Sequence, residues 1–190
     1  MREIRNQTVV VVAGAAGSGK STVAAVVARA LPAALIDIDV TFGPIVPLLA
    51  GHSRTAVREA IYEALVNTAA SAAQVGAHVV IAAPFTRERR DPPSWEHLRD
   101  RCAEAGAEAV LAWMRVPEAT LIERLAARGA GRDTSKLANP ADWLREASPE
   151  TPPNVPHIEL DGTRPADVTA RALLAELAVR EGKARAACSF

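Results

Sequence analysis

The sequence contains little cysteine and no long apolar run. Its two cysteines, Cys102 and Cys188, lie far apart, so we expect neither a disulfide framework nor a cysteine metal site, but a reduced, cytoplasmic protein. The valine-rich stretch near the amino terminus is interrupted by glycine and then by Lys20, which excludes a membrane-spanning helix there. The first residues, MREIRNQ, are not followed by the hydrophobic region and cleavage site of a secretory signal.

The chain also has no net charge and few lysines. The chain has 22 basic and 22 acidic residues, so it has no long-range field to attract a polynucleotide or an anionic membrane, and a small-molecule partner is expected. Only Lys20, Lys136 and Lys183 among the basic residues are lysines. A length of 190 residues favours one domain over residues 1–190, as a monomer or homodimer.

Short apolar runs alternate with helical patterns along the chain. Strands are predicted at 8–13, 34–39, 78–83, 108–114 and 157–160, and helices at 20–30, 55–75, 94–105, 117–128, 141–146 and 165–181. Ser94 is the expected N-cap of its helix. This alternation predicts an α/β protein, with a five-stranded parallel sheet covered by helices on both faces.

The segment GAAGSGKST, residues 14–22, follows the first predicted strand and opens the first helix. It satisfies the phosphate-binding pattern G-x-x-x-x-G-K-[ST], whose backbone N–H groups surround phosphate oxygens. Lys20 is expected to reach the β- and γ-phosphates of ATP, and Ser21 to ligate Mg²⁺. The nucleotide-binding candidates here are Gly14, Ala15, Ala16, Gly17, Ser18, Gly19, Lys20, Ser21 and Thr22.

Two aspartates follow the second predicted strand, whereas the third strand ends in VVIAAPF without an acid, and no N-K-x-D motif is present. This pattern disfavours a GTPase or a motor. It resembles the nucleoside-monophosphate-kinase-like P-loop kinases, such as shikimate kinase, gluconate kinase and chloramphenicol phosphotransferase. The resemblance implies a P-loop NTPase fold with a small lid, ATP and Mg²⁺ as cofactors, Asp37 near the metal, and Asp39 on the acceptor hydroxyl.

Alternate residues of a strand share a face, so both carboxylates are expected to point into one cleft. Either could accept the proton of an attacking hydroxyl, and which is base and which is metal ligand stays open. The alternative is that one of them caps the following segment or lies solvated in a loop.

Residues 128–148 resemble the lid of the same kinases, in which arginines close over ATP. Arg124, Arg128 and Arg132 are spaced by four, with glycines at 129 and 131 between the last two. Arg128 and Arg132 are therefore predicted to act on the phosphates, whereas Arg124 is expected on a solvated helix face. Lys136 is an additional lid cation. The resemblance also makes Thr163 and Arg164, after the last strand, candidates for contact with the adenine ring.

Residues 40–62 are predicted to bind the acceptor. Phe42 is the expected pocket residue, and the neighbouring apolar side chains, such as Ile45 and Leu48, are expected to pack on the core. In shikimate kinases an arginine of this region clamps the substrate carboxylate; Arg58 is the nearest equivalent, although surface solvation explains it too. The substrate-binding candidates are Asp39, Phe42, Arg54, Arg58, Tyr62, Phe85 and Thr86.

The sequence thus predicts an ATP-dependent phosphotransferase acting on a hydroxyl of a small molecule. A sugar, a sugar acid, a nucleoside or an antibiotic could be the acceptor, the last as a route to resistance. The main alternative is an accessory or regulatory ATPase without an acceptor. A kinase of RNA ends is disfavoured by the zero net charge, and a toxin of the zeta class is a minor further alternative.

Overall fold

The central feature of the computed structural model is a five-stranded parallel sheet in the order β2-β3-β1-β4-β5. The structure describes the backbone of residues 7–187 and the side chains of residues 7–181. The strands are β1 (Gln7–Ala13), β2 (Ala34–Asp37), β3 (Val79–Ala82), β4 (Ala107–Arg115) and β5 (Ile158–Asp161). The predicted five-stranded parallel sheet of an α/β protein is therefore confirmed.

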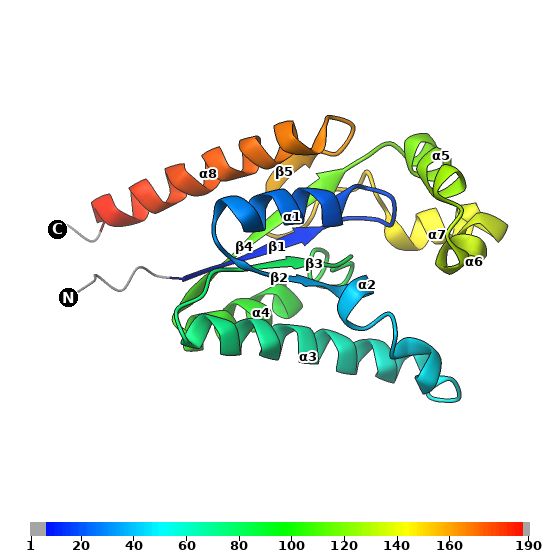
Figure 1. Ribbon diagram of the computed structural model, residues 1–190, viewed down its shortest axis with the longest axis horizontal. Helices are drawn as coiled ribbons and strands as arrows, with labels where there is room; N and C mark the ends of the chain where they lie inside the picture. Colours follow the sequence, from blue (N-terminus) through cyan, green and yellow to red (C-terminus); the bar gives the residue numbers. More distant parts are fainter. Residues whose placement is uncertain (1–6, 188–190) are drawn as a thin grey trace.

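Helices cover both faces of the sheet (Figure 1). The helices α1 (Lys20–Ala30) and α8 (Ala166–Ala187) cover one face, and α3 (Arg54–Gln74) and α4 (Pro92–Glu104) cover the other. In β1, Val9 and Val11 pack into the core beneath α3 and α4, and Val10 and Val12 pack beneath α1 and α8. Both faces of the strand are buried, which is why its sequence is continuously apolar. Within residues 7–187, no helix is long and apolar enough to cross a membrane.

The remaining elements gather beyond the carboxyl ends of the strands (Figure 1). They are α2 (Ile38–Thr41), the 3₁₀ helix η1 (Val46–Leu49), α5 (Glu118–Arg128), the 3₁₀ helix η2 (Gly131–Asp133), α6 (Thr134–Ala138) and α7 (Pro140–Ala147). In open parallel sheets this edge is where ligands bind. The last three elements occupy the segment predicted to be a lid.

Two expected element boundaries are wrong. The second strand ends at Asp37 rather than at residue 39, because the Asp37 carboxylate accepts hydrogen bonds from the backbone N–H groups of Asp39 and Val40 and starts α2. The N-cap of α4 is Asp91 rather than Ser94: the Asp91 carboxylate accepts from the Ser94 N–H at 3.2 Å. Two prolines follow Asp91, and proline is favoured in the first turn of a helix.

Candidate active site

The loop between β1 and α1 has the backbone of a phosphate-binding loop. Gly17 and Gly19 have φ angles of +82° and +89°, a region that side chains disfavour, and Gly19 is the N-cap of α1. The Lys20 Nζ atom donates a hydrogen bond to the Ala15 carbonyl oxygen at 2.8 Å, so the lysine folds back across its own loop. The loop therefore combines two glycines in the left-handed region, a helix N-terminus and a lysine ammonium in one place.

Lys20 has a strongly perturbed ionisation. Desolvation lowers its pKa to about 8, although the nearby carboxylates of Asp39 and Asp37 act in the opposite direction. The guanidinium groups of Arg128 and Arg132 add to the lowering. Within residues 7–181, the cavity around Lys20 is lined by five cationic side chains and by three carboxylates, those of Asp37, Asp39 and Asp133, and such an excess of positive charge favours a polyanion.

Asp37 and Asp39 both line the cavity at this loop, as predicted, but the strand alternation expected to bring them there is absent. Asp37 is buried and caps α2 through Oδ1, so the capping alternative is correct for this residue. Its Oδ2 makes no hydrogen bond within residues 7–181 and is free to ligate a cation. Asp39 lies in the first turn of α2 and is half exposed.

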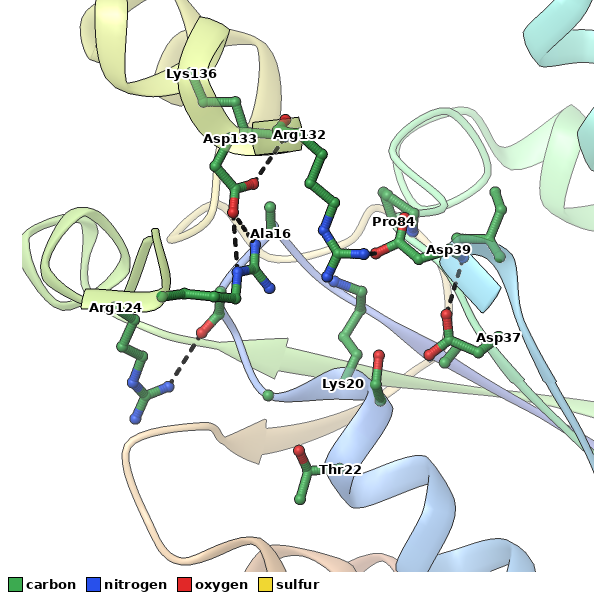
Figure 2. Close-up of a pocket in the computed structure, with 16 residues that line it drawn as sticks. Ala16, Lys20, Thr22, Asp37, Asp39, Pro84, Arg124, Arg132, Asp133 and Lys136 are labelled. Carbon is green, nitrogen blue, oxygen red and sulfur yellow. Dashed lines mark hydrogen bonds and ion pairs between the residues drawn. The ribbon is translucent and has the colours of Figure 1, made fainter. Parts of the chain in front are cut away.

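The cations Arg132 and Lys136 lie above the phosphate-binding loop (Figure 2). The Arg132 Nη1 atom lies 3.2 Å from Oδ2 of Asp39, which joins the lid segment to the opposite wall of the cavity. Arg128 and Lys136 line the same cavity and share Asp133 as partner. Arg128, Arg132 and Lys136 therefore line the cavity that also contains Lys20, and their action on the phosphates stays a prediction.

Arg124 belongs to this site, contrary to the expected solvated helix face. Its Nη1 atom donates to the carbonyl oxygen of Gly162 at 2.9 Å and to that of Gly17 at 3.4 Å. Arg124 therefore ties α5 to the phosphate-binding loop and to the turn after β5. Its spacing of four from Arg128 indicated that both arginines lie on one face of α5, but the sequence did not show which face of α5 contacts the loop.

These residues enclose a cavity of about 380 Å³. Its lining includes Ala16, Gly17, Gly19, Lys20, Ser21, Thr22, Asp37, Asp39, Arg124, Arg128, Arg132, Asp133 and Lys136. Gly14, Ala15 and Ser18 are buried within the loop itself. A cavity with this volume and several convergent charged groups is typical of a small-ligand site. The hydroxyl of Ser21 and the carboxylate of Asp37 are oxygen ligands of the kind that Mg²⁺ prefers.

A larger open cleft of about 2080 Å³ adjoins the cavity and shares Asp39, Arg132 and Lys136 with it. Its walls come from α3, from residues 42–52, from the segment after β3, and from α6 and α7. Six of the seven predicted acceptor residues line it, namely Asp39, Phe42, Arg54, Arg58, Tyr62 and Thr86.

The prediction that Phe85 binds the acceptor is wrong. Its side chain is fully buried in the core beneath α3 and α4 and packs edge-on against Tyr62, with ring centroids 5.3 Å apart. The backbone N–H of Phe85 donates to the Tyr62 hydroxyl at 3.2 Å. Phe85 therefore supports the wall of the cleft from behind and is not exposed to an acceptor.

The prediction that the apolar side chains beside Phe42 pack on the core is also wrong for several of them. Leu48 is 80% exposed and Ile45 is 45% exposed. Phe42 is half-buried, packs against the core and lines the cleft, as predicted. The segment thus offers apolar surface beside the cleft.

Arg58 already contacts two side chains of the protein. Its guanidinium lies 5.6 Å from the centre of the Tyr62 ring, and its Nη1 atom lies 3.7 Å from a carboxylate oxygen of Glu146 in α7.

Glu88, which sequence reasoning missed, lines the same cleft. Its Oε2 atom is buried with no hydrogen-bond partner in residues 7–181, and desolvation raises its pKa. Glu88 gave no signal because it lies in a loop of ordinary polar composition.

Thr163 and Arg164 are exposed in the turn after β5 and line neither cavity. The backbone N–H of Thr163 donates a hydrogen bond within the turn, to Oδ1 of Asp161 at 2.9 Å. Gly162 is the residue of this turn that meets the site, through its carbonyl bond from Arg124. A role for Thr163 and Arg164 stays a prediction.

Comparison with known proteins identifies a family and a set of structural neighbours. The profile of a family described as an AAA domain matches residues 9–149. A search of curated proteins found no match. The fold is similar to that of a gluconokinase from Sinorhizobium meliloti, with a TM-score of 0.70 and 21% identity over 95% of this chain and 97% of that one.

Two further kinases share the fold. The Mycobacterium tuberculosis APS kinase CysC, solved with AMPPNP and APS, matches with a TM-score of 0.66 and 25% identity over 90% of this chain and 98% of that one. Shikimate kinase from Acinetobacter baumannii, solved with shikimate, matches with a TM-score of 0.62 and 16% identity over 92% of this chain and 94% of that one. The structural neighbours are thus P-loop kinases of small molecules.

Proposed function

We propose that this chain, which belongs to the AAA-domain family, is a small-molecule kinase that transfers the γ-phosphoryl group of Mg·ATP to a hydroxyl group. One observation carries the proposal. The Arg132–Asp39 ion pair of 3.2 Å joins the cation-rich segment over the phosphate-binding loop to the wall shared with the larger cleft. A phosphate donor and a separate acceptor would therefore meet at Asp39.

In the proposed reaction the acceptor oxygen attacks the γ-phosphorus as the bond from that phosphorus to the bridging oxygen of ADP breaks. Asp39 takes the proton of the attacking hydroxyl, for which its half-exposed position between the two cavities is suited. Lys20, Arg128 and Arg132 stabilise the charge on the transferring group and on ADP. Mg²⁺, held by Ser21 and Asp37, would supply further charge neutralisation when bound.

The large cleft bears on the class of acceptor. Its volume of about 2080 Å³ exceeds the range of about 300–1,000 Å³ typical of ligand pockets. A sugar, a sugar acid, a nucleoside or an antibiotic would each fit within it. The chain would act as one kinase domain, with residues 128–148 as the lid and residues 40–62 as the acceptor segment.

The test measures ADP release from Mg·ATP across a panel of sugars, sugar acids, nucleosides and antibiotics, with mass spectrometry of each acceptor. We expect one class to accelerate ADP release and to gain a phosphoryl group. If ATP is turned over slowly while no acceptor gains mass, an accessory ATPase is favoured instead.

Asp39→Asn tests the proposed base. Transfer should fall by about 10²- to 10⁴-fold, since that is the usual contribution of a general base, while ATP affinity changes little. Asp167→Asn, in an exposed α8 ion pair with Arg171, is the matched control and should be unaffected. Loss of ATP binding in the Asp39 variant would instead assign Asp39 to the metal site or to the fold.

A further inference from the structure

Asp133 is a fully buried carboxylate in the lid segment, at the end of η2. Both of its oxygens have cationic partners. Arg128 donates to Oδ2 from Nε at 2.9 Å and from Nη2, and Lys136 donates to Oδ1 from Nζ at 3.1 Å. Figure 2 shows Asp133 between the lid helices and the phosphate-binding loop. Burial alone would raise the pKa of Asp133, but these hydrogen bonds lower it, so the carboxylate stays charged.

The two partners of Asp133 are not buried with it. The side chains of Arg128 and Lys136 are 36% and 26% exposed, and both line the cavity above Lys20. Asp133 therefore lies buried at the centre of a charge cluster, and the two cations of this cluster line the cavity in which phosphates are expected.

Other ion pairs of the molecule differ from this cluster. Arg145 and Asp142 in α7 lie 2.8 Å apart with side chains 76% and 58% exposed, and solvated pairs of this kind hold their partners weakly. A buried carboxylate that accepts from two cations at once holds both in fixed positions, because releasing either would leave one buried carboxylate oxygen without its charged partner.

We propose that Asp133 is a positioning residue for phosphoryl transfer, which holds the charged ends of Arg128 and Lys136 toward the transferring group. This inference rests on the proposed kinase function. Lysine and arginine side chains lose rotamer entropy when they are fixed on a ligand. Because Asp133 fixes these side chains in the folded protein, their rotamer entropy is lost on folding and not on binding. The cations therefore act on the transition state without rearrangement.

Asp133→Asn keeps the size of the side chain but removes its charge. An amide has one oxygen, and its NH₂ group faces a cation, so at least one of Arg128 and Lys136 is released from residue 133, although Lys136 still donates to the Arg132 carbonyl oxygen at 2.8 Å. The released cation still attracts phosphate. We therefore expect ADP and AMPPNP to bind within about 3-fold of the wild type, whereas interactions specific to the transition state weaken.

The assay compares two dissociation constants measured by calorimetry in the presence of Mg²⁺. One is for ADP, and the other is for ADP with aluminium fluoride, which mimics the transferring phosphoryl group. The wild type should bind the mimic more tightly than ADP, and Asp133→Asn should reduce this preference by about 10- to 100-fold. A purely structural role would lower thermal stability and leave the preference of the folded protein unchanged, and that result would overturn the proposal.

Two further variants sharpen the test. Lys136→Gln removes one of the two positioned cations and leaves Asp133 paired with Arg128. We expect a smaller loss of preference than in Asp133→Asn, and no loss overturns the proposal even if the Asp133 variant does not fold. With both changes combined, the losses should be less than additive, because Asp133 acts through Lys136. Asp167→Asn should leave the preference unchanged.

The readout is independent of the acceptor, so it separates this inference from the proposed function. A wild type with no preference for the mimic over ADP would overturn the positioning role. If the preference and its loss are observed while no acceptor gains a phosphoryl group, the positioning of the cations stands and the kinase assignment fails.

Discussion

Replacing Lys20 with methionine should make the nucleotide-free protein more stable, although it should abolish nucleotide turnover. Lys20 is half-buried at the base of a cavity that also contains Arg128 and Arg132, and its ammonium group is disfavoured there. Methionine has a similar length and shape without the charge. A residue kept for phosphate binding at the expense of stability is expected at a functional site.

The size of the effect follows from the pKa. A fall from the ordinary 10.5 to about 8 corresponds to about 3 kcal/mol of destabilisation of the charged form, at 1.36 kcal/mol per pH unit. Solvent screening of the half-buried group reduces this figure. Loss of the hydrogen bond to the Ala15 carbonyl oxygen removes about 1 kcal/mol more from the gain. We therefore expect the variant to be more stable by about 1–2 kcal/mol at pH 7.

The difference should depend on pH in a defined direction. Below about pH 8 Lys20 is charged in both the folded and the unfolded protein, so the full cost is present. Between about 8 and 10.5 the folded protein has released the proton while the unfolded protein still binds it, so wild-type stability rises with pH relative to the variant. The gap between the two proteins should close across this range.

Urea unfolding followed by circular dichroism, at pH 7 and at steps up to pH 10 without nucleotide, measures both quantities. Lys136→Met is the contrasting control: it removes a cation that is paired with buried Asp133 and should destabilise the protein. A Lys20→Met variant less stable than the wild type at pH 7, or a gap that does not change with pH, would refute the assignment of unfavourable charge to Lys20.

Two further variants test the walls of the site. Arg132→Ala should lower kcat more than it weakens binding of free ATP, because the contact of Arg132 strengthens as the phosphoryl group transfers; steady-state kinetics and calorimetry separate the two, and a change in KM alone would contradict this role. Gly162→Ala should destabilise the protein by about 1–3 kcal/mol in thermal unfolding, since the new Cβ would lie 2.5 Å from Cγ2 of Val116 and 3.0 Å from the Ser18 carbonyl oxygen. Gly131→Ala, where a Cβ meets no atom within 4 Å, is its control, and an equal loss in both would exclude the steric explanation.

Much of the fold could be predicted because its signals are local. The valine run of β1 is apolar at every position since both faces of the strand are covered, and β3 is a short apolar run of the same kind. The glycines of the phosphate-binding loop and Lys20 are adjacent in the chain, so their joint role could be inferred from spacing. Boundaries were less certain, as Asp37 shows, because one capping carboxylate ended β2 two residues early.

The residues that sequence reasoning missed act through partners distant in the chain. Arg124 contacts Gly17 and Gly162, which lie 107 and 38 residues away. Glu88 has ordinary neighbours in sequence, and only the packing around it desolvates its carboxylate. Phe85 was misassigned for the same reason: its place near the cleft was correct, but the direction of its side chain is set by its contact with Tyr62.

The sequence by itself determined the parallel sheet, the phosphate-binding loop and the presence of cations in the segment that follows α5, because periodicity, glycine and charge are properties of neighbouring residues. The tertiary structure alone decided which charges meet: Arg132 with Asp39, and Asp133 with Arg128 and Lys136. The physical reason is that burial and electrostatic interaction depend on distance in space. Asp133 is an ordinary polar residue in the sequence, and it acquires its role only when the fold encloses it between two cations.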